Sequence, residues 1–209
     1  MSRPVVVLTG FAPFGSDSTN PSWDAVEHLA SQWDAGSEGV DLVVEELPVT
    51  FADVRDRLEG LLHEHRPDLL IPVGLAAGTP AVRLERVAIN LCDARIADNR
   101  GDQPVDIEVV AAGEQALFTT LPVKAMQTAA LERGHRVDLS LSAGTFVCNA
   151  AMYHAIDLVQ GTSTRTGFIH VPDAATVRVS DVAQILKVLV HAGLAHRGRD
   201  LAVAGGALS

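Results

Sequence analysis

The sequence contains few cysteines and few basic residues, and each shortage excludes a class of protein. Its 209 residues include only two cysteines, Cys92 and Cys148, which cannot form the disulfide framework of a small secreted domain. Neither lies in a CxxC-type spacing, which argues against a cysteine metal site. The 16 Lys and Arg against 26 Asp and Glu give a net charge of −10, and no basic cluster is present to contact phosphates. We therefore expect free thiols and no nucleic-acid partner.

Long apolar runs are missing as well. No stretch approaches the roughly 20 consecutive apolar residues of a membrane-spanning helix, and residues 1–10 read as a strand rather than as a signal peptide. We expect a cytoplasmic protein that does not bind membranes. The composition, 47% hydrophobic and 20% charged, is typical of a folded globular chain. A length of 209 residues fits one domain, residues 1–209.

Short apolar runs alternate along the chain with amphipathic segments of helix length. Residues 4–9 are rich in β-branched side chains and end at Gly10, as expected for a strand buried on both faces. Asn20 and Pro21 predict the cap and first turn of a helix. This alternation predicts an α/β fold, a single three-layer α/β/α domain with a mostly parallel, mixed central sheet. The further strands are expected at residues 42–44, 69–74, 87–89, 137–141 and 167–171, and the helices at residues 21–30, 51–65, 113–120, 124–133, 149–159 and 181–196.

The first candidate for chemistry is Cys148, which follows the strand predicted at residues 137–141 and precedes a helix. Ligands of open α/β sheets collect at the carboxyl ends of strands. A helix beginning near Asn149 would direct free N–H groups and the positive end of its dipole at the sulfur, which favours a thiolate. The same N–H groups can stabilise the oxyanion that forms when a thiolate attacks an acyl carbon. The alternative is a buried, inert thiol at a helix start.

His170 and Glu85 are the candidates for a base and its partner. His170 lies near the end of the strand predicted at residues 167–171, and Pro172 interrupts pairing just after it. It is expected to face a cleft and act as base to the thiol, with a core histidine as the alternative. Glu85 stands among cations at the start of the strand predicted at residues 87–89. A carboxylate can orient an imidazole and stabilise its charged form, with a solvated ion pair as the alternative.

Two loops carry further signals. Residues 10–15 form a Gly/Pro loop with Phe11 and Phe14, which either line a small apolar pocket or cap the core below it. Residues 93–109 are charged and aperiodic, and a loop of that length is often functional. The glycine-rich residues 73–78 lack a phosphate-binding spacing, and His63 and His65 do not share a helix face, so no nucleotide or metal is expected.

Six motifs occur in order along the chain. They read TGFAPFG at residues 9–15, NPSW at 20–23, LERVAIN at 84–90, ARIADN at 94–99, AGTFVCN at 143–149 and GFIHVP at 167–172. On these motifs the chain resembles the pyroglutamyl peptidase I family of cysteine peptidases, and the resemblance covers nearly its whole length.

The resemblance implies an enzyme whose substrates are peptides with an N-terminal pyroglutamyl (5-oxoprolyl) residue, which it removes without a metal or cofactor. Family members are commonly homotetramers, so the same assembly is expected here. The implied residues are the triad Cys148, His170 and Glu85, the walls of the lactam pocket Phe11, Phe14 and Phe146, and Arg95 as an aid to the oxyanion.

The chain departs from the family pattern in the short segment of residues 171–180 and in the loop after residue 74. Many bacterial members read GQAGGR where this chain has Leu75 in place of the glutamine and Thr79 in place of the arginine. Affinity or selectivity is therefore expected to differ. One alternative is an amidase of relaxed or altered small-acyl specificity, motivated by Leu75. Another is a catalytically silent member that acts as a binding protein, against which the intact triad argues.

Overall fold

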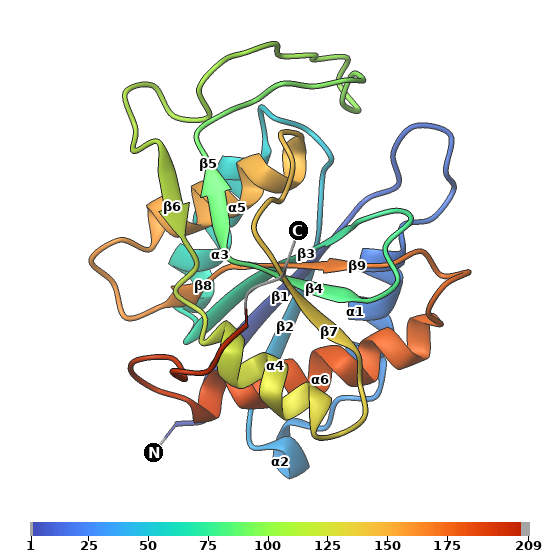
Figure 1. Ribbon diagram of the computed structural model, residues 1–209, viewed down its shortest axis with the longest axis vertical. Helices are drawn as coiled ribbons and strands as arrows, with labels where there is room; N and C mark the ends of the chain where they lie inside the picture. Colours follow the sequence, from blue (N-terminus) through green and yellow to red (C-terminus); the bar gives the residue numbers. More distant parts are fainter. Residues whose placement is uncertain (1, 206–209) are drawn as a thin grey trace.

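The computed structural model describes residues 2–205, which are built around a central sheet of seven strands (Figure 1). Six strands follow one another across the sheet, and the short β8 pairs with β3 beside this path. In spatial order they are β2 (Asp41–Leu47), β1 (Val5–Phe11), β3 (Leu69–Leu75), β9 (Phe168–Val171), β4 (Val82–Glu85) and β7 (Val137–Ser140), with β8 at Arg165–Thr166.

The sheet is mixed, and the change of direction falls next to β9. Strands β2, β1, β3 and β9 are parallel, β4 is antiparallel to β9, and β7 is parallel to β4. The carboxyl ends of β1, β3 and β9 therefore meet at one edge, and the beginning of β4 lies beside the end of β9. The fold class predicted from the sequence, α/β with a mostly parallel mixed sheet, is confirmed.

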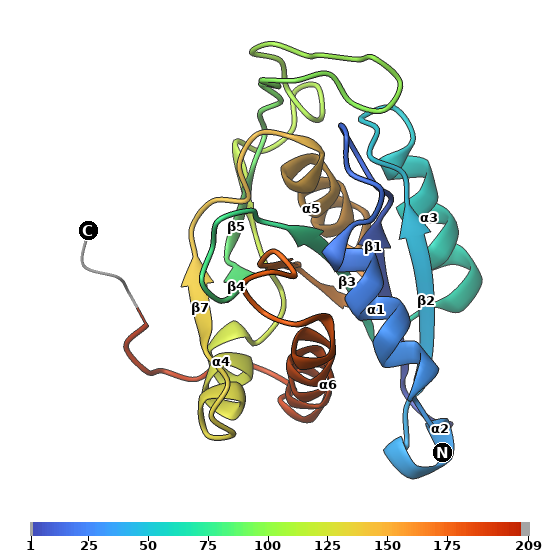
Figure 2. The same ribbon diagram turned by 90° about the vertical axis from the view of Figure 1, so that its right-hand side faces the viewer.

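Helices cover both faces of the sheet, which gives three layers (Figure 2). One face carries α1 (Pro21–Ser31), α4 (Val123–Leu131) and α6 (Val179–Ala195), whose apolar residues form one core with the sheet. The other face carries α3 (Val54–His65) and α5 (Val147–Leu158), which form a second core. A strand between two cores must be apolar on both faces, and Val6, Val7 and Leu8 of β1 are fully buried. Within residues 2–205, no helix is both long and apolar enough to cross a membrane.

The predicted cap of α1 is present and also shapes the loop after β1. The Asn20 Oδ1 accepts from the Ser22 N–H at 3.1 Å, and the Asn20 amide donates to the Ala12 carbonyl at 3.0 Å. The backbone N–H of Phe11 donates to the Ser22 Oγ at 3.0 Å. Gly10 lets the helix approach the strand this closely, because a Cβ there would lie 2.4 Å from the Cα of Trp23. The motif of residues 20–23 thus fixes the loop that carries two phenylalanines.

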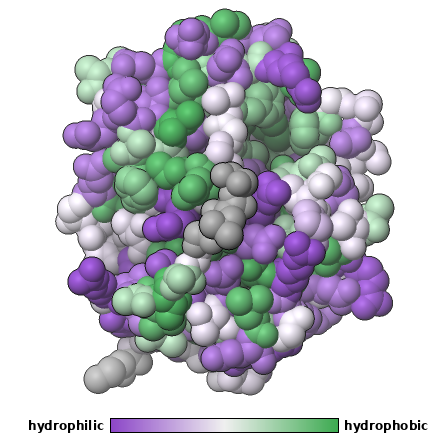
Figure 3. Space-filling view, in the orientation of Figure 1, coloured by the Kyte–Doolittle hydropathy of each residue, from purple (hydrophilic) through white to green (hydrophobic). Residues whose placement is uncertain are grey.

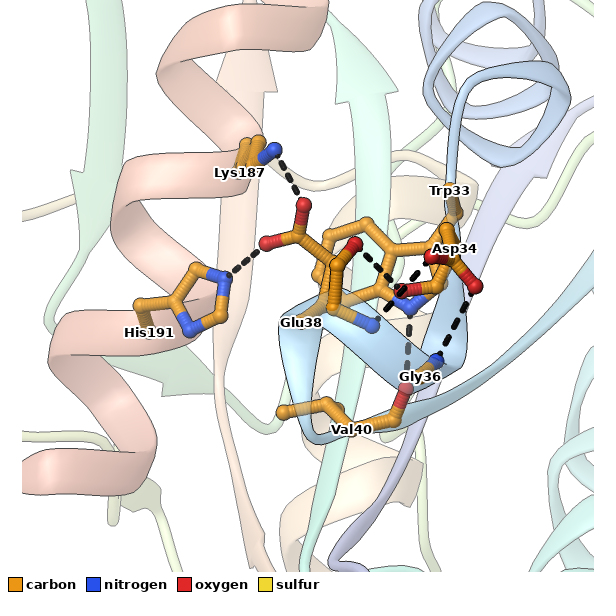
Figure 4. Close-up of polar contacts among 8 residues, drawn as sticks. Trp33, Asp34, Gly36, Glu38, Val40, Lys187 and His191 are labelled. Atoms are coloured by element: carbon orange, nitrogen blue, oxygen red, sulfur yellow. Dashed lines mark hydrogen bonds and ion pairs between the residues drawn. The ribbon is translucent and has the colours of Figure 1, made fainter.

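A polar cluster fastens the short α2 (Ala35–Glu38) to α6 (Figure 4). Glu38 pairs with the Lys187 Nζ at 2.6 Å and with the His191 Nε2 at 2.9 Å. The imidazole of His191 stacks on Trp33, with ring centroids 5.6 Å apart. The hydrogen bond from Lys187 and that from His191 lower the pKa of Glu38 despite partial burial. The connection between α1 and β2 is therefore anchored at the amino end of β2, away from the carboxyl edge.

The helix predicted at residues 113–120 is wrong. This segment contains β6 (Ala116–Phe118), which pairs antiparallel with β5 (Val87–Ile89) and sets Leu117 opposite Ala88. Leu117 packs against the second core while Ala116 and Phe118 are exposed, an alternation of period two. Pairing with β5 and a hydrogen bond from the Tyr153 hydroxyl to the Glu114 carbonyl at 2.8 Å hold the segment extended. Tertiary contacts override a local helical pattern here.

The long loop predicted at residues 93–109 is present. A single bridge joins Cys92 to Ile107 at its base. Asp98 is buried and accepts from the Phe51 N–H at 2.8 Å, and the Asn99 amide donates to the Pro13 carbonyl at 2.9 Å. The ARIADN motif thus ties this loop to the loop after β1.

Candidate active site

A cavity of about 280 Å³ opens at the carboxyl edge of the sheet. In the space-filling view, hydrophobic side chains lie in a hollow in the upper right part of the molecule, between the loop after β1 and the start of α5 (Figure 3). Six of the seven predicted site residues line the cavity. The complete lining is Phe11, Phe14, Asn20, Val49, Leu75, Ala76, Arg83, Glu85, Ser142, Ala143, Gly144, Phe146, Val147, Cys148 and His170.

Cys148 is the second residue of α5, which begins two residues before the expected start at Asn149. The first backbone bond of this helix runs from the Ala150 N–H to the Phe146 carbonyl at 3.2 Å. The preceding N–H groups, those of residues 147–149, therefore have no acceptor within the helix. Phe146 provides no side-chain cap. Cys148 therefore lies in the first turn of the helix, where the free donors and the positive end of the helix dipole are.

His170 lies on β9 with its side chain 8% exposed, between Cys148 and Glu85. Its Nδ1 is 2.8 Å from the Glu85 Oε1, which leaves the other ring nitrogen available to Cys148, the second neighbour that acts on the ring. Burial alone would lower the pKa of His170, but the hydrogen bonds and charges of Cys148 and Glu85 outweigh it and raise the pKa to about 9. The imidazole therefore carries its proton at neutral pH, beside the sulfur.

Glu85 is the last residue of β4, so its expected position at the start of the strand at residues 87–89 is wrong. The chain turns at Arg86 between β4 and β5. Glu85 is 1% exposed, and its Oε2 has no hydrogen-bond partner within residues 2–205. A solvated surface ion pair, the alternative for this residue, is therefore excluded. The carboxylate is buried and directed at the imidazole.

One row of residues across three strands shapes the floor of the site. Gly74 on β3 is in register with His170 on β9, which is in register with Arg83 on β4. A Cβ at Gly74 would lie 3.0 Å from the Cys148 Sγ and 2.8 Å from the ring of Phe168. The missing side chain at Gly74 therefore makes the space that the sulfur occupies next to the imidazole.

Aromatic rings form one wall of the cavity. The rings of Phe14 and Phe146 are 6.4 Å apart, and Phe51 meets Phe146 edge-on at 5.3 Å. Phe11 is 2% exposed and packs on Phe168 at 6.2 Å, so it caps the core as well as lining the cavity. Phe11 thus both caps the core and lines the cavity, and Phe14 also lines the cavity.

Asn149 clamps the start of α5 to the hairpin beside it. Its side chain is 1% exposed, accepts from the Ile89 N–H at 3.0 Å, and donates to the carbonyls of Ile89 and Leu91 at 2.8 Å and 3.0 Å. On the other side, the Thr145 Oγ1 donates to the Asp93 carbonyl at 2.7 Å. The residues flanking Cys148 are therefore fixed by the β5 region and the long loop.

Arg95 and Thr79 lie outside the cavity, and one residue that lines it, Arg83, was not predicted. Arg95 is exposed on the long loop and is absent from the cavity lining. Of the two departures from the family pattern, Leu75 lines the cavity, while the buried Thr79 donates to the Ala76 carbonyl at 2.9 Å. Arg83 lines the cavity and was not predicted, although its spacing of two from Glu85 places both side chains on one face of a strand.

No group of three or more His, Cys, Asp or Glu that could hold a metal ion occurs within residues 2–205. The arrangement of the cavity residues instead suits covalent catalysis. A thiol lies beside an imidazole that is hydrogen-bonded to a carboxylate, next to free backbone donors. Such an arrangement can attack an acyl carbon and hold the resulting oxyanion.

Comparison with known proteins identifies similar chains over most of the length. A sequence model of the family described as pyroglutamyl peptidase matches residues 4–190. The chain is 42% identical over 215 residues to the pyrrolidone-carboxylate peptidase of Clavibacter michiganensis subsp. michiganensis, covering 98% of this chain and 99% of that relative. It is 48% identical over 168 residues to the pyrrolidone-carboxylate peptidase of Pseudomonas fluorescens, covering 80% of this chain and 78% of that relative.

Solved structures show the same architecture. The crystal structure of pyroglutamyl peptidase I from Bacillus amyloliquefaciens superposes with a TM-score of 0.89 at 33% identity, covering 97% of this chain and 100% of the other. The pyrrolidone carboxyl peptidase from Thermococcus litoralis superposes with a TM-score of 0.84 at 30% identity, covering 92% of this chain and 94% of the other.

Proposed function

Because this chain belongs to the pyroglutamyl peptidase family, it is a cysteine peptidase that removes an N-terminal pyroglutamyl residue, and we propose that Cys148, His170 and Glu85 perform the reaction. The observation that carries the assignment is the buried imidazole of His170, which is bound to the buried carboxylate of Glu85 and has the thiol of Cys148 as its other neighbour. These residues line a cavity that Phe11, Phe14 and Phe146 also line.

In the first half of the reaction, the Cys148 thiolate attacks the carbonyl carbon that joins the pyroglutamyl group to the next residue. The carbonyl oxygen becomes an oxyanion, which accepts hydrogen bonds from the free N–H groups at the start of α5. The tetrahedral intermediate collapses as the His170 imidazolium donates its proton to the leaving nitrogen. The peptide departs with a free amine, and a thioester joins the pyroglutamyl group to Cys148.

In the second half, neutral His170 accepts a proton from a water molecule, whose oxygen attacks the thioester carbon. Collapse of the second intermediate releases pyroglutamic acid and restores the thiolate and the imidazolium. Glu85 holds the Nδ1 side of the ring at 2.8 Å throughout, which keeps the other nitrogen directed at the sulfur and stabilises the charged ring.

The aromatic wall accounts for the choice of acyl group. A lactam ring is flat, with apolar methylene groups that can contact Phe11, Phe14 and Phe146, and with one N–H and one C=O for polar partners. An ordinary N-terminal residue would carry a charged amine into this apolar surface without a partner. Leu75 adds another apolar contact at the position of the family glutamine, so the ring is held here by more apolar contact and fewer side-chain hydrogen bonds.

Several expectations from the sequence go beyond the geometry of the site. We propose that the chain acts as a single domain of residues 1–209, in the cytoplasm, as a homotetramer, without a metal or cofactor and without nucleic-acid or membrane partners. Arg95 lies outside the cavity lining, so its aid to the oxyanion stays a prediction. Light scattering on the purified protein tests the tetramer, and full activity after dialysis against a chelator tests the absence of a metal.

The proposed function is tested by turnover of matched fluorogenic amides of pyroglutamic acid, proline and acetic acid. We expect release of fluorophore from the pyroglutamyl amide alone. Comparable turnover of all three would instead indicate a relaxed amidase, and turnover of none would indicate a silent binding protein. A Phe146→Ala variant should raise KM for the pyroglutamyl amide more than it lowers kcat, because it removes a wall of the ring pocket rather than a reacting group.

A further inference from the structure

Arg83 is a charged residue in the wall of the catalytic cavity to which the triad gives no role. It lies on β4 two residues before Glu85, so both side chains project from the same face of the strand. In the antiparallel pairing of β4 with β9 it stands directly opposite His170, and Glu85 stands opposite Phe168. Residues opposite each other in such a pair have Cβ atoms about 5 Å apart. Arg83 and Glu85 thus flank the imidazole, with Arg83 nearer the carboxyl end of β9.

The charge of Arg83 has no partner within the protein that the structure describes. Within residues 2–205, no carboxylate forms an ion pair with its guanidinium. Asp138 is in register with Arg83 on β7, but its ion pair is with Arg136, at 4.0 Å. The Glu85 Oε1 is bound to His170. An arginine without an ion pair that lines a binding cavity, in a chain of net charge −10, can receive an anionic group of a ligand.

The chemistry fixes which part of the substrate reaches Arg83. The lactam ring lies toward the phenylalanines, and the attacked carbonyl lies at the sulfur of Cys148. The leaving nitrogen receives its proton from His170, so it contacts the imidazole, and the rest of the leaving residue extends from that point. In a pyroglutamyl dipeptide, the α-carboxylate of the leaving residue is two bonds beyond this nitrogen. The side chain opposite the imidazole on the neighbouring strand is Arg83.

We propose that Arg83 binds the α-carboxylate of the leaving residue and gives the enzyme a preference for pyroglutamyl dipeptides over longer or amidated peptides. This inference rests on the proposed function, since it places the leaving group by the roles of Cys148 and His170. Arg83 acts as a specificity residue on the product side of the scissile bond, and the aromatic wall selects the acyl group on the other side.

The test compares two substrates that differ in one charge, pyroglutamyl-alanine and pyroglutamyl-alaninamide, by the release of alanine or alaninamide. For the unchanged enzyme, a charge-assisted hydrogen bond in a partly open site predicts a ratio of kcat/KM of about ten in favour of the free carboxylate. In Arg83→Gln the ratio of kcat/KM should fall to about one. In Arg83→Lys it should be intermediate, because a lysine keeps the charge but cannot form the bidentate hydrogen bonds of an arginine.

Arg3→Gln is the matched control, because it removes the same charge from an exposed pair with Asp41 at the opposite edge of the sheet. Arg3→Gln should show the same ratio of kcat/KM as the unchanged enzyme. A higher salt concentration should reduce this ratio in Arg3→Gln and in the unchanged enzyme alike. A ratio near one in the unchanged enzyme, with both substrates turned over, would overturn the inference and leave the proposed function intact.

An equal loss of activity toward both substrates would indicate a different role for Arg83. If Arg83→Gln lowers kcat/KM equally for both substrates and shifts the pH profile, then Arg83 acts on the buried Glu85 Oε2 as a positioning residue, and the inference is overturned. If the unchanged enzyme turns over neither substrate, the proposed function itself fails. The two failures are thus distinguishable.

Discussion

Replacement of Glu85 by glutamine tests how much the buried carboxylate contributes to the site. Glu85→Gln keeps the size of a side chain that is 1% exposed and removes only its charge. The hydrogen bond at 2.8 Å to the Nδ1 of His170 is lost or remade by an amide that favours the neutral ring. The imidazole then loses one of the two neighbours that raise its pKa to about 9 against the effect of burial. We expect the pKa of His170 to fall.

The loss of activity follows from the same contact. Replacing the carboxylate of a serine protease triad by an amide lowers kcat by about 10⁴, because the wrong tautomer forms. A thiol is more acidic than a hydroxyl and depends less on its base, so we expect kcat/KM of Glu85→Gln to fall between about 10² and 10⁴. The alkaline limb of the pH profile, which reports loss of the imidazolium proton, should move to lower pH.

The assay is hydrolysis of a fluorogenic pyroglutamyl amide across a pH range that includes 6.5, the ordinary pKa of a histidine, and about 9, the pKa of His170 in the folded protein. The matched control is Glu59→Gln, which changes an exposed carboxylate on α3 and should leave both rate and profile as they are. If Glu85→Gln retained half of the activity with an unchanged profile, the assignment of Glu85 to the triad would be refuted.

Four further predictions follow from individual contacts. Gly74→Ala should lower kcat/KM about a hundredfold in the same assay, because a Cβ 3.0 Å from the sulfur displaces it from the imidazole, while a smaller loss than tenfold would contradict this geometry. Iodoacetamide should modify Cys148 before Cys92, whose pKa burial raises to about 11; mass spectrometry of tryptic peptides gives the order, and equal rates would argue against an activated thiol. Asn149→Ala should lower the free energy of unfolding in urea by about 2 kcal/mol, since buried backbone groups lose their partners, and no change would show that the clamp is dispensable. The unchanged protein should lose up to about 3 kcal/mol of stability as pH rises from 6.5 to about 9, because folded His170 binds its proton more tightly than the unfolded chain does, whereas His170→Ala should not show this decline.

The fold class and most site residues could be predicted from the sequence because their signals are local. A β-branched run ended by a glycine, as in β1, requires burial on both faces wherever the neighbours lie. Cys148 stands between a strand and a helix, and such a position directs helix N–H groups at its sulfur in many arrangements of the sheet. The ordered motifs then assigned the remaining positions by family resemblance.

What the sequence did not indicate depends on pairing between distant strands. Residues 113–120 read as a helix because their apolar spacing fits one, yet pairing with β5 makes three of them a strand. Glu85 was placed on the wrong strand because β4 is only four residues long. Arg83 lies opposite His170 because β4 runs antiparallel to β9, and no local pattern in the sequence indicates that pairing. The register between two strands of a sheet cannot be deduced from the sequence of either strand alone.

The identity of the nucleophile is the central claim, and the two cysteines of the chain allow a matched test. Cys148→Ala and Cys92→Ala are each assayed for release of fluorophore from a pyroglutamyl amide, with circular dichroism to confirm that both are folded. We predict that Cys148→Ala has no activity above background and that Cys92→Ala, which lies outside the catalytic cavity, retains most of the activity. Full activity in folded Cys148→Ala would contradict the account.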